Sequence, residues 1–135
     1  MQAIVVTKLI TEPGQHVAEN IEHRTDWPDE PNPGPGELLI KTEASAFNHM
    51  DLWIGKGLPG HKLEYPRIGG ADGCGRVEAV GEGVDDTWIG RRVVINAAIP
   101  QPVRTRPTDP PASTLAPSYQ LLGETINGMH REYFR

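Results

Sequence analysis

The sequence predicts a mainly β fold that contains the corner of a small, strongly bent barrel. Two observations predict it: short runs of alternating apolar and polar residues, and a glycine-dense stretch from Ile68 to Asn96 that lies around two such runs. Glycine at that density indicates backbone with positive φ, or close approach of the chain to its neighbours. Such glycines mark bulges and sharp bends in sheets, so the flanking strands are expected to curve.

The expected strands have the β-branched and alternating character of half-buried strands. They are Ala3–Thr7, Glu37–Thr42, Arg76–Val80 and Arg91–Ile95. A Gly-Glu-Gly turn, Gly81 to Gly83, follows the third strand and indicates a hairpin with the fourth. Between the first two strands, the segment Asp26–Gly36 contains four prolines, so we expect it to be a surface connection.

One short helix is expected to begin near Asn48. Asn48 is a good N-cap residue, and the carboxylate of Asp51 stands three residues later, where it can accept the N–H of the cap. Gly55 and Gly57 are expected to end the helix.

Size and charge limit the class of protein. A chain of 135 residues suffices for one core, and its net charge of −5 argues against nucleic acid or an anionic membrane as a partner. No apolar run approaches the ~20 residues that span a bilayer. The lone cysteine, Cys74, excludes an internal disulfide framework and fits a reducing compartment, so a cytoplasmic domain is expected.

Five blocks of sequence together resemble the N-terminal half of the medium-chain dehydrogenase/reductase superfamily. The central block reads G-x-D-G-x-G-x-V-x-x-V-G-x-G-V and is followed by G-x-R-V. The others are Met1–Thr7, Pro33–Lys41, Ala44–Gly57 and Tyr119–Tyr133. This superfamily contains the zinc alcohol dehydrogenases and the zinc-free quinone oxidoreductases. The resemblance implies the GroES-like fold, a partly open β-barrel with a few short helices, over residues 1–135.

The residues of both zinc sites of that superfamily are missing. Its catalytic zinc takes a cysteine at the position of Asn48 and a histidine followed by a glutamate at Ala71-Asp72. An amide, a methyl group and one carboxylate do not make a zinc site. The four cysteine positions of the structural zinc fall on Pro102, Thr105, Thr108 and Ala116. Zinc is therefore not expected, and no other set of ligands with metal spacing replaces it.

The remaining pattern is similar to the zinc-free quinone oxidoreductase branch. The resemblance implies Asn48, Asp51 and Asp72 as catalytic residues, and Asn48, His49 and Trp53 as residues near the cofactor. Alternatives remain for several of them: Asn48 as a helix cap only, Asp51 as a structural partner of the helix dipole, and Trp53 as a core residue. The other histidines, His130 among them, have no motif around them.

The resemblance also implies NAD or NADP as cofactor and a small alcohol, aldehyde, ketone or quinone as substrate. The superfamily binds the dinucleotide on a Rossmann domain, whose fingerprint is G-x-G-x-x-G. The pairs Gly73-Cys-Gly75 and Gly81-Glu-Gly83 lack its third glycine and are assigned to barrel turns. The sequence therefore predicts the N-terminal portion of a longer oxidoreductase, inactive alone. The alternative is a stand-alone, non-catalytic binding or assembly module, and either could form a homo-oligomer.

Overall fold

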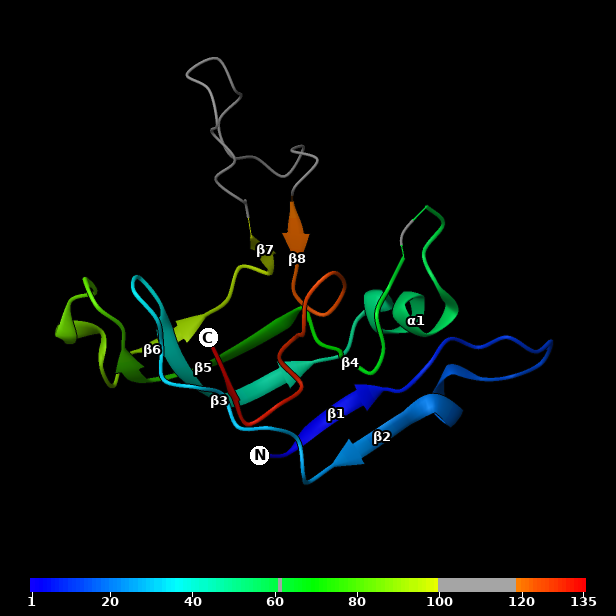
Figure 1. Ribbon diagram of the computed structural model, residues 1–135, viewed down its shortest axis with the longest axis horizontal. Coiled ribbons are helices and arrows are strands. Elements are labelled where there is room, and N and C mark those ends of the chain that lie inside the picture. The colour runs from blue at the N-terminus through cyan, green and yellow to red at the C-terminus, as the bar shows by residue number, and fades with distance from the viewer. Residues whose placement is uncertain (61, 100–118) are drawn as a thin grey trace, which may run out of the picture.

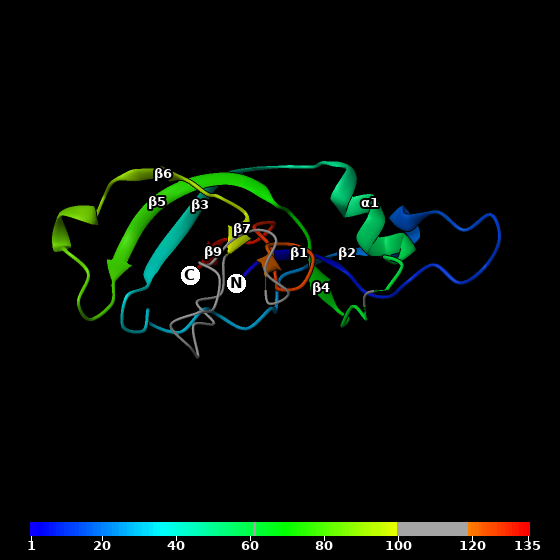
Figure 2. The ribbon, with the colours of Figure 1, turned by 90° about the horizontal axis from the view of Figure 1, so that it is seen from above.

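Two long antiparallel strands, β3 (Leu38–Ala46) and β5 (Asp72–Val80), form the centre of the fold. The structure, a computed structural model, describes residues 1–60, 62–99 and 119–135. The register between the two strands shifts at Leu39/Ile40 and again at Thr42/Ala44. Such irregularities bend a strand and increase its twist. Both strands accordingly curve along the molecule, as Figure 2 shows.

The remaining elements surround this pair (Figure 1). The other strands are β1 (Ala3–Val6), β2 (Ile21–Arg24), β4 (Arg67–Ile68), β6 (Arg92–Val94), β7 (Ala98–Ile99), β8 (Gln120–Leu121) and β9 (Tyr133–Phe134). The helices are α1 (His49–Lys56) and two short 3₁₀ helices, Val17–Asn20 and Asp86–Trp88.

Within the described ranges, the strands form three antiparallel sheets. Their orders are β2-β1-β4, β6-β5-β3-β9 and β7-β8. Among the described residues these sheets do not close into one continuous barrel, which confirms the expected mainly β fold with a partly open barrel and few short helices. In the same part of the chain, no helix is long or apolar enough to cross a lipid bilayer.

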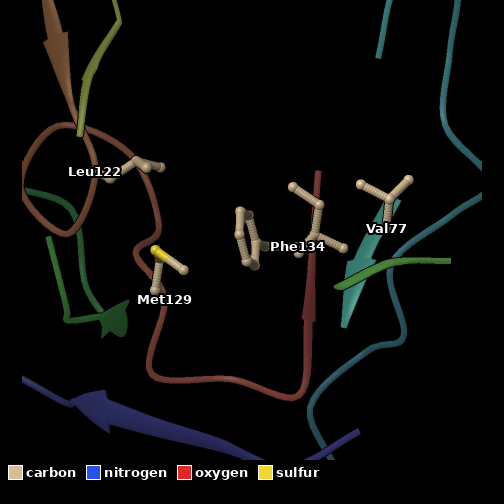
Figure 3. Close-up of a cluster of buried hydrophobic side chains, with 5 residues drawn as sticks. Val77, Leu122, Met129 and Phe134 are labelled. Atoms are coloured by element: carbon tan, nitrogen blue, oxygen red, sulfur yellow. The ribbon is translucent and has the colours of Figure 1, made fainter. Parts of the chain in front are cut away.

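The main core lies between the β3–β5 pair and the returning C-terminal segment. It is built by Ile40, Val77, Leu122, Met129 and Phe134. Figure 3 shows the Phe134 ring between Met129 on one side and Val77 on the other. Phe134 reaches this position because β9 pairs with β3 and so returns the end of the chain to the sheet. Burying one such side chain contributes about 1.5–3 kcal/mol, which is why a two-residue strand holds its place.

The expected helix is confirmed, with one correction. Helix α1 begins after the cap Asn48 and ends at Gly57, which has φ +86°. Gly55 does not end the helix, because it lies inside α1 and is buried. A Cβ at Gly55 would clash with the side chain of Val17, so this glycine allows the 3₁₀ helix Val17–Asn20 to pack against α1.

The assignment of Gly73 and Gly75 to a barrel turn is wrong. Both lie within β5, which begins at Asp72 rather than at Arg76. A Cβ at Gly75 would clash with the carbonyl oxygen of Lys41, because the irregular strand β3 comes very close there. These glycines therefore serve the close approach of two strands, whereas Gly81 and Gly83 do lie in the turn after β5.

Candidate functional site

Asn48 joins the beginning of helix α1 to strand β5. Its side-chain oxygen Oδ1 accepts the backbone N–H of Met50 at 2.7 Å, which caps the helix. Its amide nitrogen Nδ2 donates to Oδ2 of Asp72 at 2.5 Å. Two of the residues proposed as catalytic from the sequence are thus in direct contact. Asn48 is half-buried and Asp72, the first residue of β5, is exposed, so both can be reached from solvent.

Asp51 is the buried centre of the same region. Its Oδ2 accepts the N–H of Asn48 at 2.9 Å, and its Oδ1 accepts the N–H of Gly70 at 2.9 Å. Burial of the carboxyl group opposes its ionisation. The interactions with His130, Asn48 and Gly70 outweigh burial, so the pKa of Asp51 lies below its ordinary value. An ionised Asp51 therefore fixes the two chain segments that carry Asn48 and Asp72.

His130 is the functional candidate that the sequence did not reveal. Its side chain is only 3% exposed, and its Nε2 lies 3.4 Å from Oδ1 of Asp51. Its other ring nitrogen, Nδ1, is 2.8 Å from Oγ of Ser45. The ring of Phe47 packs against the imidazole with their centroids 4.6 Å apart. No motif marks His130, because its partners lie 79 and 85 positions away in the chain.

Backbone hydrogen bonds place His130 beside Asp51. The N–H of Met129 donates to Gly70 at 2.9 Å and the N–H of His130 donates to Gly69 at 3.1 Å. A Cβ at Gly70 would lie 2.7 Å from Nδ1 of His130, so the imidazole occupies space that any other residue at position 70 would fill. Glycines before β5 thus allow the C-terminal segment to approach. The spacing of these glycines in the sequence did not indicate that His130 would pack against them.

His49 and Trp53 lie on the exposed side of α1. Their ring centroids are 6.0 Å apart, with 44° between the ring planes. Trp53 is 50% exposed, so the interpretation of this residue as part of the core is wrong. It lies in the middle of helix α1, whose buried side is formed by Asp51, Ile54 and Gly55, and its ring is on the exposed side.

A hollow lies beside His130. It is a cavity of about 300 Å³ between β1 and the segment that leads into β9. Its lining includes Gln2, His23, Thr42, Ser45, His130 and Glu132. Asn48 and Asp72 are not part of that lining, so this cavity and the Asn48–Asp72 pair are separate features.

The fold and the site can now be compared with known proteins. A family model described as the alcohol dehydrogenase GroES-like domain matches residues 34–135. This chain belongs to the alcohol dehydrogenase GroES-like domain family. The match covers the β3–β5 pair, helix α1 and the segment that carries His130. The family of this GroES-like domain, expected from the sequence, is thereby confirmed.

Comparisons with individual proteins agree with this family assignment. The alcohol dehydrogenase of Moraxella sp. is 35% identical over 105 residues, which is 78% of this chain and 31% of that protein. A zinc-type alcohol dehydrogenase-like protein of Schizosaccharomyces pombe is 45% identical over 62 residues, 46% of this chain and 18% of that protein. The crystal structure of an NAD-dependent alcohol dehydrogenase superposes with a TM-score of 0.80 at 36% identity, covering 99% of this chain and 36% of that one. The chain thus spans about a third or less of the length of these relatives.

The described residues at the expected catalytic zinc positions do not fit that metal. Within the ranges that the structure describes, no three His, Cys, Asp or Glu side chains are grouped so as to hold a metal ion. Ala71 is 5% exposed and offers only a methyl group, and both polar groups of the Asn48 side chain already make hydrogen bonds. The four positions expected to correspond to the structural zinc, from 102 to 116, lie outside the described residues.

Proposed function

We propose that this chain is the N-terminal, substrate-side portion of an NAD(P)-dependent alcohol dehydrogenase or quinone oxidoreductase-like enzyme that works without zinc. Membership of the GroES-like domain family supports the reaction class. The observation that carries the zinc-free assignment is the hydrogen bond between Asn48 and Asp72. It joins the two positions where a zinc-dependent relative would place a thiolate and a carboxylate.

Asn48 would hold the reacting carbonyl group. Its amide nitrogen carries two hydrogens, of which Asp72 accepts one. The second would donate to the carbonyl oxygen of an aldehyde, ketone or quinone. Negative charge develops on that oxygen as hydride is added, and a fixed donor aimed at it lowers the barrier.

Asp72 and Asp51 would orient this donor rather than take part in the chemistry. Asp72 restricts rotation of the Asn48 amide, and Asp51 restrains the backbone at the same residue through its N–H. A donor held by two anchors needs no reorganisation when the carbonyl oxygen becomes charged. This assigns Asp51 a positioning role, in keeping with its burial.

The nicotinamide end of NAD or NADP would lie against His49 and Trp53, with Asn48 beside it; when bound, the cofactor supplies or accepts the hydride. The exposed Trp53 ring offers an apolar face on the helix that Asn48 caps. The one G-x-G-x-x-G string in the sequence, Gly55 to Gly60, lies at the end of helix α1 and does not open a helix after a strand, so the phosphates would be held elsewhere. The 135 residues alone are therefore proposed to be inactive.

A chimera tests this proposal. The 135 residues replace the matching segment of the NAD-dependent alcohol dehydrogenase that shares 36% identity, so that the nucleotide-binding part of that protein is kept. We expect oxidation of NADH or NADPH with a panel of aldehydes, ketones and quinones, undiminished by a chelator. Asn48→Ala should reduce kcat at least ~10-fold. A folded chimera that binds cofactor but turns over none of the panel contradicts the proposal and favours a non-catalytic module.

A further inference from the structure

Ser45, His130 and Asp51 form a continuous series of polar groups. Oγ of Ser45 lies 2.8 Å from Nδ1 of His130, and Nε2 of the same ring lies 3.4 Å from Oδ1 of Asp51. The His130 and Asp51 side chains are 3% and 11% exposed, whereas Ser45 is exposed. A hydroxyl group, an imidazole and a carboxylate in this order are the parts of a base-activated nucleophile.

The Asp51 carboxylate lies 3.4 Å from Nε2 of His130, and this ring nitrogen makes no hydrogen bond within the described part of the structure. The carboxylate already accepts the N–H groups of Asn48 and Gly70 and can only accept hydrogen bonds when ionised. In the tautomer that carries its proton on Nε2, facing this negative charge, the ring presents its lone pair at Nδ1 to Oγ of Ser45. The hydroxyl of Ser45 then donates to Nδ1, and the imidazole is placed to take its proton.

Access is from the cavity of about 300 Å³ described above, which Ser45 and His130 line together with Thr42 and Glu132. The Phe47 ring covers the imidazole from another side and holds it in place. The hydroxyl is therefore open to a small molecule while its base is withdrawn from water. A space of this size admits a ligand of a few carbon atoms rather than a polymer.

We propose that Ser45 is a nucleophile that accepts the acyl group of small activated carboxylic esters, with His130 as its general base. A lone pair of Oγ forms a bond to the ester carbonyl carbon as the Oγ proton passes to Nδ1. The bond between that carbon and the leaving oxygen then breaks, and the leaving group takes the proton from Nδ1. The products are acyl-Ser45 and an alcohol or phenol. This activity is independent of the nucleotide-dependent function proposed above.

A fluorophosphonate probe tests the reactivity directly, because the Oγ of an activated serine displaces fluoride from phosphorus. The folded 135-residue chain is incubated with the probe, and intact-mass and peptide-mapping spectrometry identify the modified residue. We expect one adduct per chain, on Ser45, formed at least ~10-fold faster than in the same chain unfolded in urea. General-base assistance increases a rate by about 10²–10⁴-fold, so a ~10-fold difference between folded and unfolded chain is expected to be measurable.

Three variants identify the residues that are responsible for labelling by the probe. Ser45→Ala should abolish the adduct, and His130→Asn, which keeps a polar group near Ser45 without a base, should slow labelling at least ~10-fold. Thr87→Val, which removes an exposed hydroxyl outside this cavity, is the control and should label at the rate of the unaltered chain. Folding of each variant is checked by circular dichroism.

Two results overturn the proposal. One is labelling of Ser45 in the folded chain no faster than in the unfolded chain. The other is a folded His130→Asn variant that labels at the unaltered rate. Where His130→Asn does not fold, the comparison of the folded and unfolded parent chains decides alone.

Discussion

Oδ1 of Asp51 accepts the backbone N–H of Gly70 at 2.9 Å, so a side chain on helix α1 holds the segment that leads into β5. The other carboxylate oxygen accepts the N–H of Asn48. One buried group thereby fixes the relative position of the residues that carry the candidate site. Removing its charge should loosen both connections at once.

Asp51→Asn should lower the free energy of unfolding by about 1–3 kcal/mol, because hydrogen bonds to a charged acceptor are the stronger ones and an amide replaces one oxygen with a donor. Urea denaturation followed by tryptophan fluorescence measures the change. Asp72→Asn is the matched control, because Asp72 is an exposed carboxylate that also contacts Asn48. It should change the free energy of unfolding by less than ~1 kcal/mol.

Asp51 should also make the domain sensitive to acid. The pKa of Asp51 is lower in the folded state than in the unfolded state, so the unfolded chain binds a proton more readily. Its stabilisation is complete above the unfolded pKa of about 4, and is lost as pH falls through the lower folded value. Thermal melts from pH 6 to pH 2.5 should show a smaller acid-induced drop for Asp51→Asn than for the unaltered chain. Equal slopes contradict this assignment.

Gly81→Ala should be among the most destabilising glycine substitutions in the chain. A Cβ at Gly81 would clash with the carbonyl oxygen of Gly34, so the backbone must move. We expect a loss of about 3 kcal/mol or more. Gly83 lies two residues further along the same turn, and a Cβ there would meet open space. The cost of Gly83→Ala therefore comes only from its φ of +81°. That control should lose about 1–2 kcal/mol, and equal losses at the two positions would refute the steric explanation.

Asn48→Ala should weaken helix α1 by about 0.5–2 kcal/mol, because the N–H of Met50 loses its acceptor. Asn48→Ser can still accept that N–H and should retain most of the stability, yet it lacks an amide to donate to Asp72. Denaturation curves of the two variants therefore separate capping from the Asn48–Asp72 contact. In the chimera, both variants should lose activity, since the proposed donor is missing from each.

Purified protein should carry no stoichiometric zinc, because amide, methyl and carboxylate groups stand at the positions of the catalytic ligands. Elemental analysis after chelator-free purification measures the metal content. Structural zinc contributes ~10 kcal/mol or more to folding where it is needed, so EDTA should leave the Tm unchanged. About one zinc per chain contradicts the prediction.

NADH and NADPH should bind the 135 residues weakly or not at all, since no glycine-rich loop opens a helix to receive the phosphates. Isothermal titration calorimetry should give a Kd above the millimolar range. A micromolar Kd with this chain would contradict the division of roles proposed here. The chimera serves as the positive control.

The local sequence predicted those features that neighbouring residues control. Helix α1 begins where Asn48 and Asp51, three positions apart, supply the cap, and it ends where Gly57 adopts positive φ. Strands β1, β3, β5 and β6 were found within a few residues because each carries its own apolar alternation. The two-residue strands β4, β7, β8 and β9 were not predicted, since so short a segment has no period to detect.

The pairing of distant segments was decided only by the tertiary structure. Asn48 and Asp72 were each expected in the site from the family resemblance, but their hydrogen bond depends on the register of β3 against β5. His130 reached Asp51 and Ser45 only because the C-terminal segment hydrogen-bonds to the glycines before β5. For Trp53 the sequence left a place near the cofactor and a place in the core open, and only the structure shows that the buried side of α1 is formed by other residues. Caps and turns follow from residues close in sequence; long-range contacts follow from which backbones can approach one another.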